Sequence, residues 1–364
     1  MKKKQPIVVA LSLDQETPDI VSAALELGRR LGAPIVALHA IRERALEGHE
    51  HLEARIAEAR DRVDGHLASL RDAGVEVRDV RVEVGRPAEL VLMTASLVAA
   101  RLVVTGGGRP ATVRRWVFGS VAESVVRHAS VPVWVARGRW PVGRPIICPI
   151  DLSPESLHGL ETAVRMARAL EAPLEVMTVL TEDDKTLSDR REVQPRLDRS
   201  KVGAKQQIEE VLRGYDLAGL QTTVTVEKGE PAGCIVDAAD SAGLLVVGSR
   251  GYDPLVREWV GPVTARALRH SLCSTLMVRQ VGEGHEERER AVVRLAELYE
   301  EGRALLDDDR GEEAFPLLER AAAQAPANAA VQEAFAMALD RVGRPVEATS
   351  RRDLVTIIRR RLES

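Results

Sequence analysis

The feature that most constrains this chain is an internal duplication with a period of about 140 residues. Residues 6–40 align with residues 145–179, and residues 82–96 align with residues 226–240. The offset between the two copies stays between 139 and 144 along their whole length. A match that keeps its register over so long a stretch indicates two copies of one structural unit. We therefore predict two domains of the same fold, followed by a C-terminal extension.

Each copy alternates short apolar runs with longer segments of helical periodicity. Residues 7–11 read Ile-Val-Val-Ala-Leu, and the helix expected after them ends at Ala-Pro in positions 33–34. Long polar helices are expected at residues 51–73 and 198–214. Apolar strands that alternate with helices predict parallel β-α-β units with both sheet faces covered. The predicted fold class is therefore α/β with doubly wound parallel sheets, joined by a linker at residues 139–144.

A glycine-rich turn follows a buried strand near the end of each copy. Residues 101–108 (RLVVTGGG) align with residues 244–251 (LLVVGSRG), and residues 119–137 align with residues 261–279. Each turn leads into a helix, and a strand end followed by a helix start is where α/β folds hold phosphate groups. The two turns are therefore the first candidates for a ligand site.

The turn of the second copy has a defined glycine spacing. Gly248, Gly251 and Gly261 are separated by two and nine residues, with Ser249 and Arg250 inside the turn. Glycines suit such a turn because the backbone can approach ligand oxygens with no Cβ in the way. The helix expected from Gly261 directs its free N–H groups and positive dipole end at an anion.

This spacing resembles the nucleotide-binding signature of the universal stress protein (UspA-type) family. The resemblance covers about residues 5–137 and 144–280, and Asp151 in IDLSPES stands where that family contacts the adenine. It implies two adenine-nucleotide α-hydrolase-like domains at residues 1–138 and 144–281. It also implies that ATP or a related adenine nucleotide, accompanied by Mg²⁺, is the ligand.

One residue of the second copy departs from the family pattern. Pro262 stands where the family has serine or threonine. Proline is tolerated at the first helical position, but it provides neither a hydroxyl nor an N–H. We therefore expect weakened triphosphate binding, with Thr264 replacing part of the lost hydroxyl.

The first copy departs from the pattern in a complementary way. Gly119 and Ser120 keep the helix start and its hydroxyl, and Gly108 ends a glycine run that can form an anion-binding concavity. However, Ser12 occupies the place of Asp151, and Thr105 stands at the place of the first glycine when the two turns are aligned as above.

The loop of the first copy, residues 109–118, is also one residue longer than nine in this alignment. Together with Ser12, this predicts weaker base recognition in the first copy. Nucleotide binding is therefore expected mainly in the second.

The C-terminal extension has a different composition. After a flexible linker expected at residues 281–284, residues 286–364 are rich in Ala, Glu, Arg and Leu with helical periodicity. Residues 295–328 resemble one 34-residue tetratricopeptide repeat in the positions of its small residues and closing proline, namely Gly302, Ala314, Ala321 and Pro326. Residues 329–362 match a second repeat less well. A tetratricopeptide-like tail that contacts a partner protein is expected, and a plain helical hairpin remains the alternative.

Bulk composition excludes several classes of function. The net charge of −4 and an aromatic content of 3% argue against nucleic-acid binding. No apolar run approaches about 18 residues, so no membrane span is expected. Three scattered cysteines, Cys148, Cys234 and Cys273, indicate reduced thiols in a cytoplasmic protein.

Three functions are compatible with these features. The first is a non-catalytic stress-response regulator that binds adenine nucleotide, with the last strands at residues 131–136 and 275–279 paired and the tail contacting a protein or mediating self-association. The second is a nucleotide-free interaction scaffold with degenerate pockets. The third is a slow ATPase in which Asp151 binds Mg²⁺, although no catalytic base accompanies the glycine turn.

Overall fold

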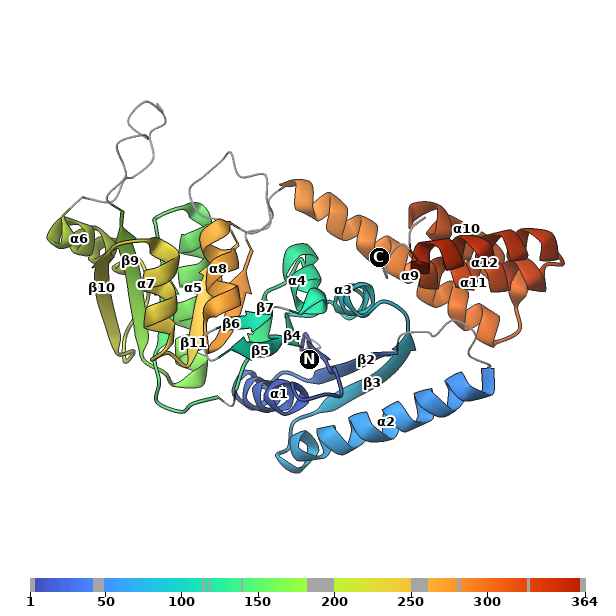
Figure 1. Cartoon of the computed structure of the whole chain (residues 1–364), viewed down its shortest axis with the longest axis horizontal. Coiled ribbons are helices and arrows are strands. Elements are labelled where there is room, and N and C mark those ends of the chain that lie inside the picture. Colours follow the sequence, from blue (N-terminus) through green and yellow to red (C-terminus); the bar gives the residue numbers. More distant parts are fainter. Residues whose placement is uncertain are drawn as a thin grey trace.

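A computed structural model describes residues 4–41, 49–112, 115–117, 119–138, 140–181, 200–249, 261–279, 283–325 and 328–360. It shows two α/β halves side by side and a helical tail (Figure 1). The elements of the first half are β1 (Ile7–Ala10), α1 (Thr17–Leu31), β2 (Ile35–Ile41), α2 (His49–Asp72), β3 (Val77–Val84), α3 (Pro87–Leu97), β4 (Leu102–Gly106), β5 (Arg109–Thr112), β6 (Arg115–Val117), α4 (Ser120–His128) and β7 (Val133–Ala136).

The second half repeats this order over its described residues, and the positions that correspond to the hairpin β5–β6 lie outside them. Its elements are β8 (Ile146–Pro149), α5 (Pro154–Leu170), β9 (Leu174–Leu180), α6 (Lys201–Leu212), β10 (Thr222–Lys228), α7 (Pro231–Ala239), β11 (Leu244–Gly248), α8 (Pro262–His270) and β12 (Ser274–Val278). Four tail helices follow, namely α9 (Glu283–Asp307), α10 (Gly311–Gln324), α11 (Ala329–Arg341) and α12 (Pro345–Arg360).

Ten strands of the described residues form one continuous sheet. Their order is β10-β9-β8-β11-β12-β7-β4-β1-β2-β3, so each half has its first strand in the middle and its last strand at the junction. Within each half the strands are parallel. The predicted doubly wound α/β fold is therefore confirmed, because the chain crosses first to one side of the central strand and then to the other.

Strand residues alternate between two hydrophobic cores, one on each face of the sheet. In β1, Ile7 and Val9 face the core that contains α1, α2, α5 and α6. Val8 faces the core that contains α3, α4, α7 and α8. Covering both faces explains why β4 and β11 are buried along their entire length.

The two halves join through their last strands. β7 and β12 pair antiparallel, with Trp134 opposite Leu276. Trp134 is fully buried, and its ring lies 6.1 Å from that of Trp140 in the linker between the halves. The pairing expected between the last strands therefore forms within one chain, and it covers two edges that would otherwise be open.

Two arginines at matching positions of the duplication form hydrogen bonds across the junction between the halves. Arg137, at the end of β7, donates to the carbonyl oxygens of Ser271 (2.9 Å) and Leu268 at the end of α8. Arg279, at the end of β12, donates to the carbonyl of Arg127 (2.8 Å) at the end of α4. A cation at a helix C-terminus satisfies free carbonyls and complements the helix dipole. Each half thus caps a helix of the other.

The tail packs against the first half. Helix α9 runs alongside α3, and its residues Leu298 and Tyr299 belong to the same buried core as Leu90 of α3 (Figure 1). The helix already begins at Glu283. The flexible linker expected at residues 281–284 is therefore wrong in its second part, because Glu283 and Gly284 belong to helix α9.

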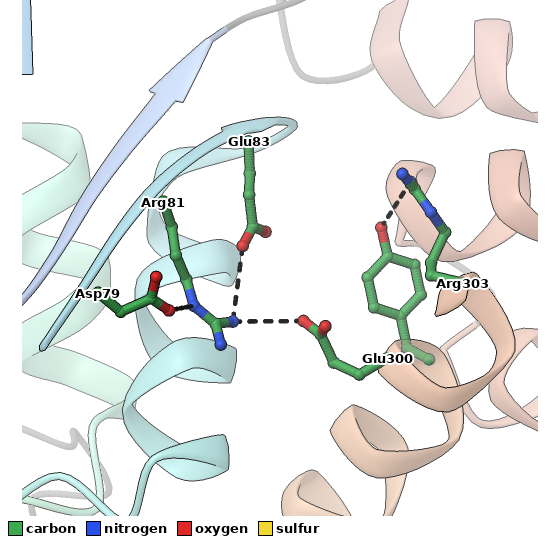
Figure 2. Close-up of polar contacts among 6 residues, drawn as sticks. Asp79, Arg81, Glu83, Glu300 and Arg303 are labelled. Atoms are coloured by element: carbon green, nitrogen blue, oxygen red, sulfur yellow. Dashed lines mark hydrogen bonds and ion pairs between the residues drawn. The ribbon is translucent and has the colours of Figure 1, made fainter. Parts of the chain in front are cut away.

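A polar cluster lies where α9 meets β3 (Figure 2). The guanidinium of Arg81 forms ion pairs with Asp79 (2.9 Å), Glu300 (3.4 Å) and Glu83 (3.7 Å). On α9, Arg303 contacts the hydroxyl of Tyr299 at 3.5 Å. Burial, followed by the nearby Glu300 carboxylate, raises the pKa of Glu83. Ionised Glu83 is thus disfavoured in the folded protein.

This cluster gives the stability of the protein a specific pH dependence. Because the pKa of Glu83 is higher in the folded than in the unfolded state, its ionisation lowers the free energy of unfolding as pH rises from about 4.5 through the folded pKa. We expect Glu83→Gln to be more stable than the wild type at pH 7, by up to about 1 kcal/mol, and equal to it below pH about 4.5. Melting temperatures measured between pH 4 and 8 test this.

The control is Glu76→Gln, whose carboxylate precedes the same strand and pairs with Arg78 but is 63% exposed. It should follow the wild type at every pH. A Glu83→Gln variant that is less stable than the wild type at pH 7 would show instead that the attraction to Arg81 exceeds the penalty of burial.

Candidate functional site

A pocket of about 240 Å³ lies at the carboxyl ends of the strands in the second half. It opens between β8 and β11, the two neighbours from which the chain leaves in opposite directions. Such a switch point leaves a crevice in doubly wound sheets, and ligands bind there. The walls come from β8, β9, β11 and the first turns of α5, α7 and α8.

Asp151 is the first predicted site residue in this pocket. It follows β8 and lines the cavity. Its Oδ1 accepts hydrogen bonds from the N–H (3.0 Å) and hydroxyl (2.6 Å) of Ser153, which caps helix α5. This turn holds the carboxylate at the pocket wall, where it can accept hydrogen bonds from a ligand amino or hydroxyl group.

Gly248 ends β11 and also lines the pocket. A Cβ at this position would lie 2.7 Å from the carbonyl oxygen of Glu155 in the first turn of α5. Gly159, one turn later, is also tightly packed but less so, with its own Cβ position 3.3 Å from the Gly248 nitrogen. Glycine is therefore required here for the close approach of helix and strand, and this contact shapes the pocket floor.

Gly261 and Pro262 form the opposite wall, at the start of α8. The Gly261 N–H donates to the carbonyl of Ser249 (3.0 Å), and the Ser249 N–H donates to the carbonyl of Val278 (2.9 Å). Ser249 is buried beside the pocket. Two of the N–H groups expected to contact phosphate are therefore already bonded within the protein.

Thr264 lines the pocket, but its side chain is also engaged. Its hydroxyl donates to the carbonyl oxygen of Gly248 at 3.0 Å, and the residue is buried. This bond ties α8 to β11. The expectation that the hydroxyl replaces the one missing at Pro262 stays a prediction. The predicted residues Arg250 and Gly251 lie outside the described residues.

The strand register corrects the sequence alignment of the first half. Gly106 pairs with Ala136, whereas Gly248 pairs with Val278, and the two partners are equivalent positions of the duplication. Gly106, not Thr105, is therefore the counterpart of Gly248. Gly106 precedes Gly119 by thirteen positions, as Gly248 precedes Gly261. The loop expected to be one residue longer is thus of equal length.

The predicted residues of the first half form their own group. Gly108 adopts a φ of +88°, which favours glycine, and a Cβ on Gly119 would lie 3.9 Å from its Cα. Ser120, the first residue of α4, is exposed to solvent. Gly108, Gly119 and Ser120 thus lie together, but in the other half of the chain from Asp151.

A side-chain exchange distinguishes the two halves at the position of Asp151. In the first half Ser12 donates to Asp14 (2.6 Å), and in the second half Ser153 donates to Asp151 (2.6 Å). The same pair is present in both turns with its members reversed. The carboxylate of the first half is consequently two residues further along the turn, which explains physically why its base recognition is expected to differ.

Sequence reasoning missed the side walls of the pocket. Met177 and Thr178 of β9 and Ile235 of α7 line it. The Thr178 hydroxyl donates to the Ile150 carbonyl (2.8 Å). At the matching place of the first half, His39 contacts the Leu11 carbonyl, also at 2.8 Å. The predicted topology could have indicated the wall formed by β9, because a doubly wound order places β9 beside β8.

Two further observations concern the described ranges alone. None of their helices is both long enough and apolar enough to cross a membrane. Their His, Cys, Asp and Glu side chains form no group of three suited to a metal ion. Burial raises the pKa of Cys148 and of Cys273 to about 12, so neither is a reactive thiolate at neutral pH.

Comparison with known proteins gives consistent matches. The Universal stress protein family matches residues 4–137 and 143–279. A Staphylococcus aureus (strain USA300) protein described as a universal stress protein is 28% identical over 137 residues, which make up 36% of this chain and 82% of that protein. The crystal structure of a universal stress protein from Archaeoglobus fulgidus covers 77% of this chain and 99% of its own, with a TM-score of 0.59 and 18% identity. A Pseudomonas aeruginosa structure described in the same way covers 81% and 98%, with a TM-score of 0.57 and 15% identity.

Two doubly wound halves joined by their last strands, with a pocket at the switch point of the second, define a duplicated α/β protein with a candidate ligand pocket. The family match extends over well more than half of the residues. The chain therefore belongs to the Universal stress protein family, with two family domains in tandem and a helical tail.

Proposed function

We propose that this protein is a non-catalytic stress-response regulator that binds an adenine nucleotide of the ATP class in its second half. The pocket lined by Asp151, Gly248 and Gly261 supports this proposal. It combines an apolar enclosure for a flat ring with a carboxylate for hydrogen bonding and a helix start for an anion. Mg²⁺ would enter with the nucleotide.

The proposal divides the chain into three units with different roles. Residues 1–138 are the altered stress-protein domain, residues 144–281 the nucleotide-binding domain and residues 286–364 a tetratricopeptide-like tail. Gly302 supports the last assignment, because a Cβ there would lie 2.6 Å from Leu318 of the neighbouring helix. The tail would contact a partner protein or a second copy. Three free cysteines are consistent with a cytoplasmic location.

A nucleotide-free scaffold is the second candidate. The observation that favours it is the large share of pocket-side donors, Thr264 among them, already bonded within the protein. Under this alternative, the tail alone would carry the function. A slow ATPase is a third candidate, and it predicts phosphate release that depends on Asp151.

The test of the proposal is calorimetric titration of the full chain with adenosine compounds, supported by mass spectrometry of small molecules released on denaturation. We expect one binding site per chain. Asp151→Asn should weaken binding about tenfold or more, since a hydrogen bond to a charged group contributes about 1.5–3 kcal/mol. Ser12→Ala, at the equivalent position of the first half, is the matched control and should leave affinity unchanged.

The possible results separate the three candidates. Binding that is lost in Asp151→Asn and retained in Ser12→Ala supports the regulator. No released nucleotide and no heat with any adenosine compound at millimolar concentration would leave the scaffold. Steady phosphate release that disappears in Asp151→Asn would indicate the ATPase.

A further inference from the structure

We infer that the second-half pocket selects an adenine nucleoside or nucleoside monophosphate over the corresponding di- and triphosphates. This inference rests on the proposed function and refines it, because it concerns which part of the ligand the pocket holds. The chain retains the elements that enclose a base and ribose. Among the described residues, the start of α8 lacks a hydroxyl and an N–H at Pro262 that would hold a chain of phosphates.

The charge of the lining is the first observation. Of the sixteen lining residues identified within the described part of the chain, Asp151 is the only charged one. A carboxylate repels a polyphosphate and attracts hydrogen-bond donors of a base or ribose. Most of the other walls are apolar, formed by Ile150, Met177, Val179, Ile235, Val247 and Ala267. This surface matches an uncharged ring better than a highly charged chain.

The donors at the start of α8 are the second observation. Pro262 has no N–H, and the N–H of Gly261 is bonded to Ser249. The first intrahelical bond runs from Ala265 to the carbonyl of Gly261, so the N–H groups of Val263 and Thr264 are the ones that the helix itself does not use. Two neighbouring N–H groups suit one phosphate. They do not suit three.

The first half provides an internal reference for what is missing. Helix α4 begins at Gly119-Ser120, where α8 begins at Gly261-Pro262. Ser120 has both a hydroxyl and an N–H and is exposed. The chain thus contains the fuller donor set in the half that has Ser12 in place of Asp151. The hydroxyl and the N–H that Pro262 lacks are therefore present at the matching helix start of the first half.

The experiment is a calorimetric series with adenosine, AMP, ADP and ATP, each with Mg²⁺, on the full chain. We expect adenosine or AMP to bind at least as tightly as ATP. ATP binding more than about tenfold tighter than AMP would overturn the inference while leaving the proposed function intact. If none of the four ligands binds, the proposed function itself fails, so the two failures are distinguishable.

Variants test the cause of the preference. Pro262→Ser should strengthen ATP binding about tenfold without changing adenosine binding, since one added hydroxyl and one added N–H act only on phosphate. Ser120→Ala is the matched control in the first half and should change neither affinity. An unchanged ratio of ATP to adenosine affinity in Pro262→Ser would reject the assigned cause.

Arg250 requires its own variant, because it lies in the glycine turn outside the described residues. We expect Arg250→Ala to leave the order of the four affinities unchanged. If the wild type prefers ATP and Arg250→Ala abolishes that preference, the turn supplies the missing positive charge and the inference is wrong. Melting temperatures of all variants confirm that each remains folded.

Discussion

Gly248→Ala should lower the free energy of unfolding by about 2–3 kcal/mol and weaken ligand binding about tenfold or more. The added Cβ would lie 2.7 Å from the carbonyl oxygen and 2.9 Å from the carbonyl carbon of Glu155. These are backbone atoms, so helix α5 as a whole must move away from β11. That movement displaces Ser156, which lines the pocket and bonds Asp151. Urea denaturation and calorimetric titration measure the two effects.

Two other glycines serve as controls for this substitution. Gly106→Ala, at the same position of the first half, would bring the Cβ against the Glu16 side chain, which can move aside. It should therefore have a smaller effect on stability. Gly65→Ala, on helix α2 with no atom within 4 Å of the added Cβ, should stabilise the protein by about 0.5–1 kcal/mol. Equal losses at Gly248 and Gly106 would show that backbone contact is not the cause.

Arg137→Met should lower the free energy of unfolding by about 3 kcal/mol. Arg137 is 3% exposed, and burial lowers its pKa to about 10, so its charge is retained at neutral pH. Methionine fills similar space but leaves the carbonyls of Ser271 and Leu268 without this buried donor. Each such unsatisfied group contributes a penalty of about 1–3 kcal/mol.

The pseudo-symmetric counterpart provides the comparison. Arg279→Met removes the equivalent contacts to α4, but Arg279 is partly exposed, so water can satisfy the released carbonyls. Its effect should be about 1 kcal/mol or less. The midpoint of urea denaturation measures both variants. A loss at Arg279 as large as that at Arg137 would contradict the role assigned to burial.

The overall fold could be predicted because the same alternation of apolar strands and helices occurs in both copies of the duplication. Apolar strands that alternate with helices and the duplication each indicated the same doubly wound order. The pairing of the last strands, which the family resemblance implied, fits that order. Arg137 and Arg279 could also have been recognised, since both end the last strand of their half. Their positions at the ends of the last strands were visible in the sequence, but the helix carbonyls to which they donate were not.

The details of the site were less predictable for physical reasons. Residues 105–108 contain three consecutive glycines, so two alignments differing by one position fit equally well, and only strand pairing decides between them. Thr264 looked available because its position faces the pocket. Whether its hydroxyl bonds a ligand or the Gly248 carbonyl depends on a 3.0 Å distance between two elements. The early start of helix α9 at Glu283 was not predicted, because Gly284 in its first turn is typical of a linker.

The antiparallel pairing of β7 with β12 has a consequence for how the protein behaves on dilution. A pair of separate subunits dissociates when its concentration falls below its Kd, whereas two covalently linked units keep a constant effective concentration. The two halves therefore stay together at any expression level, always in a one-to-one ratio. Each half always has the other, and not a copy of itself, as its neighbour. Sequence changes in one half are thus never mirrored across the junction.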